Sequence, residues 1–191
     1  METEGRYNMG SLLIEDLPHY TVHEYKQWEG NWELIYGVPY AMSPAPVNKH
    51  QLLSGKIFRQ LDESLDTCSQ CMAIIEADWI LNHDTVFRPD IAVICYEPED
   101  YLTKAPEIIF EVISPSTAKR DETIKFQAYG EEGVTYYCLV YPDTLIAKLY
   151  KYKNGQYVKV GDFDEGTYTF KTKKCQLKFN FSVMFKQFRK N

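Results

Sequence analysis

The chain has no apolar run near the roughly 20 residues that a membrane-spanning helix requires, so a transmembrane protein is not expected. Residues 1–10 also lack the basic region and the apolar core of a signal peptide. Internal repeats and low-complexity linkers are missing, and 191 residues with 45% hydrophobic content can fill one sizeable core. We therefore expect a cytoplasmic protein without a membrane partner, with an N-terminal extension at residues 1–20 and a single domain over residues 21–191.

Positive charge is also in short supply. Lys and Arg number 21 against 27 Asp and Glu, which gives a net charge of −6. Broad electrostatic binding of nucleic acid normally leaves a basic footprint, so an extended DNA surface is not indicated, while a local contact stays open. The end of the chain is a basic exception that we interpret as a solvated surface. Its cations are Lys171, Lys173, Lys174, Lys178, Lys186, Arg189 and Lys190.

Cysteine is not arranged as a recognisable disulfide or zinc framework. The five cysteines, an odd number, occur in apolar or strand-like contexts, which favours reduced core thiols. Cys68-Ser69-Gln70-Cys71 has the spacing of half a zinc site, but no second Cys/His pair with zinc spacing follows, so we interpret it as coincidence. A Gly-x-Ser-x-Gly nucleophile motif is missing too. Ser114, Ser116 and Thr117 are therefore predicted to cap a helix rather than to act as nucleophiles.

Hydrophobic periodicity predicts an α/β or α+β fold in which helices flank a mixed sheet. A strand, helix, strand passage through Glu111, Lys125 and Val140 is typical of a parallel crossover. The predicted helices are Thr21–Trp28, Asn48–Leu65, Thr117–Glu131 and Phe181–Phe188. The predicted strands are two within Trp32–Met42, closed by Ser43-Pro44-Ala45-Pro46, and then Met72–Leu81, Phe87–Cys95, Glu107–Ile113, Thr135–Val140, Leu145–Tyr152 and Tyr157–Val160.

Two acids stand out because their surroundings are apolar. Asp90 follows Pro89 at the start of an apolar run, and Glu111 lies inside another. Because side chains alternate along a strand, Glu111 shares its face with Ile109 and Ile113. Burial of an unpaired carboxylate is costly, so such an acid needs a cation, a metal ion or a proton. A structural ion pair with Lys or Arg is the alternative to a metal site here.

The helix that follows Glu111 adds a cation to these acids. Asp121, Lys125 and Tyr129 are spaced four residues apart, so they form one stripe that can face the sheet. A hard divalent ion on two carboxylates, with a lysine nearby, can promote hydrolysis of a phosphodiester by neutralising developing charge. Asp121 and Lys125 alone could equally be a helix-surface pair.

These residues resemble a known family. Arg88-Pro89-Asp90, the segment Glu111-Val112-Ile113-Ser114-Pro115-Ser116-Thr117, and the later Asp121, Lys125 and Tyr129 are similar to the Uma-type "putative restriction endonucleases" of the PD-(D/E)XK nuclease superfamily. The upstream Trp32-Glu33-Leu34-Ile35-Tyr36-Gly37 and His50 add to the likeness, which runs from about Thr21 to about Val160.

The resemblance implies a restriction-endonuclease-like fold and Mg²⁺-dependent or Mn²⁺-dependent endonucleolytic cleavage of DNA. Asp90 and Glu111 would bind the metal together with the backbone carbonyl of Val112. The position two after Glu111 is Ile113 where the superfamily has its lysine, so the resemblance transfers the catalytic lysine to Lys125 on the next helix. Accessory polar groups would come from Glu33, His50 and Asp121.

Three functions remain open after this comparison. The first is a metal-dependent deoxyribonuclease. The second is a nuclease fold without turnover that serves as a binding or interaction protein, and the third is a metal-dependent hydrolase of a substrate other than DNA. Tyrosine-rich strands in the second half of the chain, together with the pairing of related nucleases, also suggest a homodimer.

Overall fold

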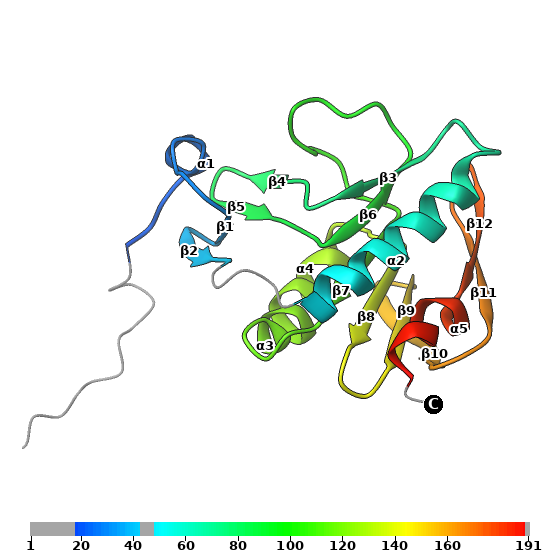
Figure 1. Cartoon of the computed structure of the whole chain (residues 1–191). Helices are drawn as coiled ribbons and strands as arrows, with labels where there is room; N and C mark the ends of the chain where they lie inside the picture. The colour runs from blue at the N-terminus through cyan, green and yellow to red at the C-terminus, as the bar shows by residue number, and fades with distance from the viewer. Residues whose placement is uncertain (1–17, 43–47, 190–191) are drawn as a thin grey trace, which may run out of the picture.

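The N-terminal part of the fold is a short helix followed by a small antiparallel sheet. The computed structural model describes residues 18–42 and 48–189 (Figure 1). Helix α1 (Val22–Tyr25) is shorter than the predicted Thr21–Trp28, and the side chains of Thr21 and Glu24 form a capping box at its start. Strands β1 (Trp32–Ile35) and β2 (Val38–Ala41) then pair as predicted. The predicted end of this hairpin at Ser43–Pro46 lies outside the described residues.

Two predicted strands are wrong because each divides between two sheets. The segment predicted as Met72–Leu81 forms β3 (Met72–Ile75) and β4 (Trp79–Asn82), and Glu76 between them has a left-handed φ of 47°. The segment predicted as Phe87–Cys95 forms only the end of β5 (Thr85–Phe87) and all of β6 (Ile91–Ile94). The small sheet has the order β2-β1-β5-β4. Asp90 therefore lies at the junction where the chain leaves this sheet for the larger one.

The larger sheet has six strands and is mixed, as predicted. Its order is β10-β9-β8-β7-β6-β3. Strands β7 and β8 are parallel, and the other neighbours are antiparallel. The bounds of the remaining strands are Ile108–Val112 for β7, Tyr136–Tyr141 for β8, Ile146–Lys153 for β9 and Gln156–Phe163 for β10.

Helices cover both faces of this sheet. Helix α2 (Asn48–Leu65) has the predicted bounds, and it packs against the face that carries Phe110. Leu52 is 46% exposed, because it lies off the stripe of α2 that faces the sheet. The predicted helix 117–131 consists of α3 (Ala118–Arg120), a π-helical turn (Asp121–Lys125) and α4 (Phe126–Glu131). This helix packs on the opposite face, the one that carries Glu111.

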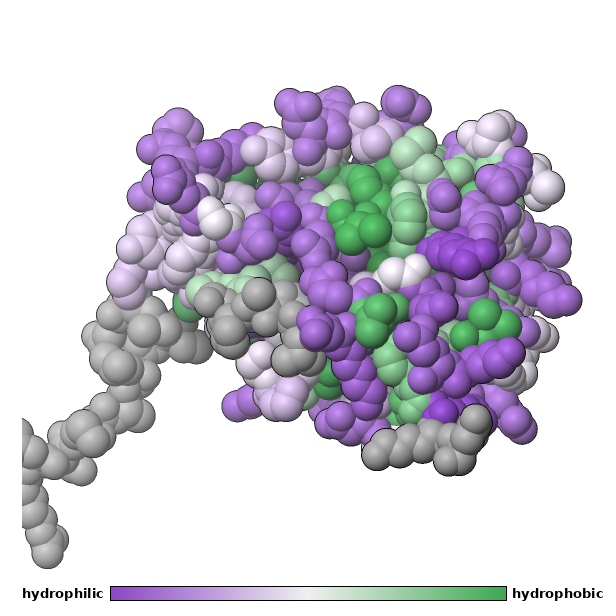
Figure 2. All heavy atoms as spheres, viewed as in Figure 1, coloured by the Kyte–Doolittle hydropathy of each residue, from purple (hydrophilic) through white to green (hydrophobic). Residues whose placement is uncertain are grey.

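The C-terminal part contains a hairpin that periodicity did not predict. Strands β11 (Thr167–Lys171) and β12 (Gln176–Asn180) pair with each other and lead into α5 (Phe181–Phe185) and a 3₁₀ turn (Lys186–Phe188). Buried Leu177 and Phe179 alternate with exposed Lys178 along β12. The cations predicted to form a solvated surface are exposed at every described position, from Lys171 to Arg189, although the segment that carries them is folded. Figure 2 shows mainly hydrophilic atoms on the α2 side, with apolar atoms in small separate groups.

The expectation of reduced core thiols is wrong for four of the five cysteines. Disulfides join Cys68 to Cys175 and Cys71 to Cys95, and Cys138 is free and buried. The unpredicted hairpin brings Cys175 back to the end of α2, and the antiparallel pairing of β3 with β6 places Cys71 opposite Cys95. Among the helices of residues 18–42 and 48–189, none is both long and apolar enough to cross a bilayer.

Candidate active site

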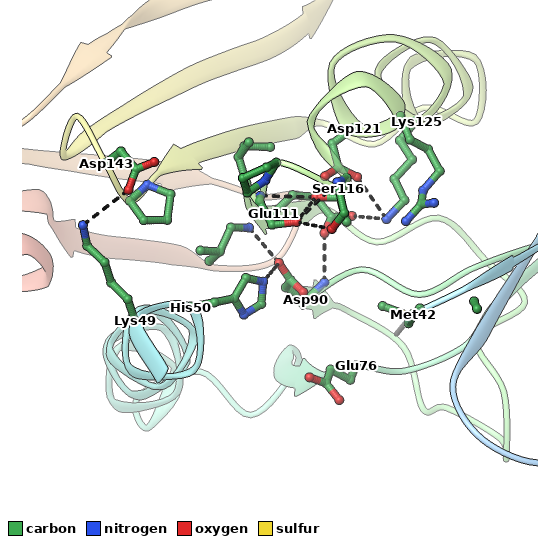
Figure 3. A pocket seen from close by; sticks show the side chains of 18 residues that line it. Met42, Lys49, His50, Glu76, Asp90, Glu111, Ser116, Asp121, Lys125 and Asp143 are labelled. Carbon is green, nitrogen blue, oxygen red and sulfur yellow. Dashed lines mark hydrogen bonds and ion pairs between the residues drawn. The ribbon is translucent and has the colours of Figure 1, made fainter. Parts of the chain in front are cut away.

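A cavity of about 380 Å³ opens where the two sheets meet the start of α2 and the π-helical turn. Figure 3 shows that His50, Asp90, Glu111 and Lys125 reach it from different elements. Its walls also include Val112 at the end of β7 and the loop that follows, residues 113–117. Residues far apart in the sequence therefore share one concave site.

Asp90 is held at this cavity by contacts on one of its two carboxylate oxygens. Oδ2 accepts a hydrogen bond from the Val112 N–H at 2.7 Å and lies 3.1 Å from His50 Nε2. His50 projects from the first turn of α2, and Asp90 itself is 8% exposed. Within the described residues no hydrogen bond to Oδ1 is found, so this oxygen is available to a ligand.

Glu111 is interlocked with Asp90 and with the helix above it. Its Oε2 accepts a hydrogen bond from the Asp90 N–H at 3.2 Å. Asp90 in turn accepts from the N–H of Val112, the residue after Glu111. Its Oε1 accepts from Lys125 Nζ and from the Tyr129 hydroxyl, both at 3.0 Å. These contacts bring the two predicted carboxylates together and orient them.

Lys125 lies at the centre of a buried ionic network. Its Nζ is 2.8 Å from Glu33, 3.0 Å from Glu111 and 3.4 Å from Asp121. Arg120 lies 3.1 Å from the second oxygen of Glu33. The π-helical turn contains both Asp121 and Lys125, and π turns are frequent at functional sites. Lys125 is therefore a buried ion-pair partner rather than half of a helix-surface pair.

Burial and neighbouring charges shift the pKa values of Glu111, Asp121 and Lys125 in opposite directions. Burial raises the pKa of Glu111 well above its ordinary value, and the nearby Lys125 ammonium opposes that shift. Burial also raises the pKa of Asp121, again against Lys125. For Lys125 burial lowers the pKa, but the surrounding carboxylates, Glu111 first, raise it well above its ordinary value. Lys125 consequently stays a cation at neutral pH.

The donor set fits a hard divalent cation. Four acids (Asp90, Glu111, Glu33 and Asp121) face only two permanent cations, Lys125 and Arg120, so carboxyl groups outnumber the cations of the buried network. Carboxylate and carbonyl oxygens are the ligands that Mg²⁺ and Mn²⁺ prefer. In the described part of the chain no three His, Cys, Asp or Glu side chains form a ready metal cluster. An ion here would combine two carboxylates with backbone and water oxygens.

The remaining predicted residues occupy the margin of the site. Glu33 is fully buried on β1 and contacts Lys125 from behind, without lining the cavity. Ser114 and Thr117 bond to each other before the helix, but Thr117 at the N-cap of α3 makes no side-chain cap hydrogen bond, so the predicted capping by Thr117 is wrong. Arg120 and the hydroxyl of Tyr129 were not assigned to the site from the sequence. The stripe that joins Tyr129 to Lys125 was the available signal for Tyr129.

Comparisons with known proteins identify the family and the fold. Residues 22–173 match the model of the Uma2 family, described as "Putative restriction endonuclease". The fold is similar to the crystal structure of "a putative nuclease belonging to DUF820" from Anabaena variabilis, with a TM-score of 0.71 and 18% identity over 87% of this chain and 97% of that chain. No curated protein matches the sequence. Because the family match extends over most of its length, the chain belongs to the Uma2 family of restriction-endonuclease-like proteins.

Proposed function

We propose that the protein is a metal-dependent endonuclease that hydrolyses DNA phosphodiester bonds at the cavity beside β7. The observation that carries this proposal is the interlocked pair of Asp90 and Glu111, in which Asp90 keeps one carboxylate oxygen uncommitted and Glu111 accepts from the buried Lys125. The family and the fold of its structural neighbour support a nuclease, and DNA is the substrate that the family description suggests.

Asp90, Glu111 and the carbonyl of Val112 would hold Mg²⁺ or Mn²⁺. The bound ion would neutralise charge on the phosphate and acidify a bound water. His50 holds Asp90 by one oxygen and thereby sets the direction of the other, as outer-shell partners of metal ligands commonly do.

Lys125 is suited to donate hydrogen bonds rather than to accept a proton. Its raised pKa keeps it charged, so a non-bridging phosphate oxygen or the attacking water is its natural partner. Glu33 and Asp121 hold the ammonium beside Glu111. The displaced lysine therefore reaches the carboxylate pair from the helix, where Ile113 on the strand has no charge to offer.

Plasmid nicking in the presence of Mg²⁺ tests this proposal. Glu111→Gln is expected to abolish nicking while the fold persists, because the amide keeps the shape of the side chain and removes a charge from an acid cluster. Glu132→Gln, on an exposed acid outside the network, is the matched control and is expected to nick at the wild-type rate. Equal nicking by wild type and Glu111→Gln would contradict the assigned role.

A binding protein without turnover is the second candidate. It is favoured by the enclosure of Lys125, which is 2% exposed and already neutralised by three carboxylates. Calorimetric titration with Mg²⁺ separates the two candidates, because a binding protein that does not use a metal would release no heat of Mg²⁺ binding at this site. A panel of double-stranded DNA, single-stranded DNA and RNA then tests DNA against other substrates of a metal-dependent hydrolase.

A further inference from the structure

Four cysteines gather at the end of the large sheet that is opposite to the cavity. Strand β6 begins one residue after Asp90 and ends one residue before Cys95, so the strand separates the two places. Cys68 follows α2, Cys71 precedes β3, and Cys175 precedes β12. Figure 1 shows the end of α2 beside β12, away from the helix that carries the ionic network.

The two disulfides of this group are parts of one compact cluster. Thr172 Oγ1 lies 3.8 Å from the sulfurs of both Cys71 and Cys95. The same oxygen accepts a hydrogen bond from the Cys175 N–H at 2.8 Å and donates to the Cys175 carbonyl at 3.1 Å. A single hydroxyl therefore contacts one disulfide directly and the backbone of the other. Cys71, Cys95 and Cys175 are each less than 10% exposed.

We propose that the reduced forms of Cys68, Cys71, Cys95 and Cys175 together bind one Zn²⁺ ion. Cys68 and Cys71 have the two-residue spacing of a zinc-binding pair, and the fold supplies from Cys95 and Cys175 the second pair that the sequence lacks. Structural zinc is tetrahedral with four thiolates at about 2.3 Å, which places the sulfurs roughly 3.8 Å from one another.

With both disulfides formed, no group of three cysteines in the described residues is ready to hold a metal, so zinc binding requires reduction and movement of the cysteine side chains. The paired Cα atoms are 6.1 Å apart for Cys68 and Cys175 and 3.9 Å apart for Cys71 and Cys95. Separating each sulfur pair to the zinc spacing requires rotation of cysteine side chains about the Cα–Cβ bond. The shared Thr172 neighbour shows that the two pairs do not lie in separate parts of the fold.

Local charge also suits a zinc–thiolate centre. Four thiolates and Zn²⁺ carry a net charge of −2, which a nearby cation would stabilise. Lys174 Nζ lies 2.8 Å from the Cys95 carbonyl, and Lys173 is its neighbour along the turn between β11 and β12. Lys173 and Lys174 of the C-terminal hairpin would thereby offset the negative charge of the zinc–thiolate centre.

Conversion from the disulfide form to the zinc form is balanced with a phosphine as reductant. Two disulfides, two phosphines and two waters give four thiols and two phosphine oxides. The four thiols then release four protons as their thiolates bind Zn²⁺. Either form ties the C-terminal hairpin to α2 and to the β3–β6 edge of the sheet, independently of the cavity.

Cobalt substitution of the full-length chain tests the proposal. After reduction by a phosphine and removal of the excess under nitrogen, Co²⁺ is expected to produce thiolate-to-metal charge-transfer absorption and the visible bands of a tetrahedral site. Zn²⁺ should displace these bands at one ion per chain. Absence of charge-transfer absorption in the reduced wild-type protein would overturn the proposal and leave the cysteines as disulfides only.

Variants locate the ion within the chain. Cys95→Ser is expected to reduce tight zinc binding from one ion per chain to none, whereas Cys138→Ser removes a buried cysteine outside the cluster and should keep the full value. Glu111→Gln should also keep it, which separates this site from the proposed catalytic metal. Equal zinc content in Cys95→Ser and wild type would refute the assignment. If a variant misfolds, the cobalt spectrum of the wild-type protein still tests the proposal without it.

Discussion

Replacement of Lys125 by Met removes the ammonium from the buried network and keeps much of the side-chain volume. In the structure this ammonium lies 2.8 Å from Glu33 and 3.0 Å from Glu111, and the lysine is 2% exposed. Arg120 can still neutralise Glu33 at 3.1 Å, but Glu111 and Asp121 both lose the cation that they contact. Loss of one partner from a buried ion pair costs about 3–5 kcal/mol. For a domain of this size the melting temperature should fall by roughly 6–20 °C.

The loss of stability should depend on pH in a defined direction. Burial already raises the pKa of Glu111, and removal of the ammonium that opposes this shift raises it further. A carboxyl group whose pKa is higher in the folded state than in the unfolded state favours folding as the pH falls. The free-energy difference between Lys125→Met and wild type should therefore shrink when the pH is lowered from about 8 to about 5.

Urea denaturation followed by circular dichroism measures this difference in free energy of unfolding. Lys49→Met is the matched control, because Lys49 is at the cavity margin and its partner Asp143 is 93% exposed at 3.7 Å. A surface pair of this kind contributes less than about 1 kcal/mol. If Lys125→Met at pH about 8 also stays within about 1 kcal/mol of wild type, the ammonium is not the counter-ion that holds Glu111.

Three further outcomes are expected. Lys125→Ala should stop DNA cleavage without loss of Mg²⁺ binding. Adding Ile113→Lys to that variant should restore part of the nicking, because Ile113 shares the strand face of Glu111 and lines the cavity. No recovery in a folded double variant would contradict the idea that a lysine at either position can serve the site. His50→Ala should weaken Mg²⁺ binding by about 10–100-fold in calorimetric titration through loss of its contact with Asp90, and unchanged affinity would exclude that positioning role. The edge strand β10 with its exposed valines predicts a homodimer. A monomeric mass by light scattering at micromolar protein concentration would disprove it.

Local sequence patterns were sufficient for elements whose stability depends on neighbours along the chain. Helix α2 has the bounds that its apolar spacing predicted, and Thr21 caps α1 through Glu24, three residues away. The same reasoning failed at Glu76 and at Pro89, where a continuous apolar pattern hides a change of sheet. Alternation indicates that a residue faces a core, but it does not say which of two sheets supplies that core.

The types of group in the candidate site were evident from the sequence, because an acid within an apolar strand has few physical solutions. Asp90, Glu111 and Lys125 followed from that reasoning and from the family resemblance. Which atoms meet was decided by packing alone. The 2.7 Å contact between Asp90 and the Val112 N–H, and the enclosure of Lys125 by Glu33, depend on the relative placement of strands and helix to within a fraction of a hydrogen-bond length.

The cysteines illustrate the same division at longer range. From the sequence, Cys68 and Cys71 form an incomplete pair, and the other members are 24 and 107 residues from their partners. The β3–β6 pairing and the β11–β12 hairpin bring them together. Because strand register and hairpin position are set by the burial of whole strand faces, no short sequence motif could predict that these four cysteines lie together. The sequence by itself determined which residues carry reactive chemistry, and the tertiary structure decided which of them share a site.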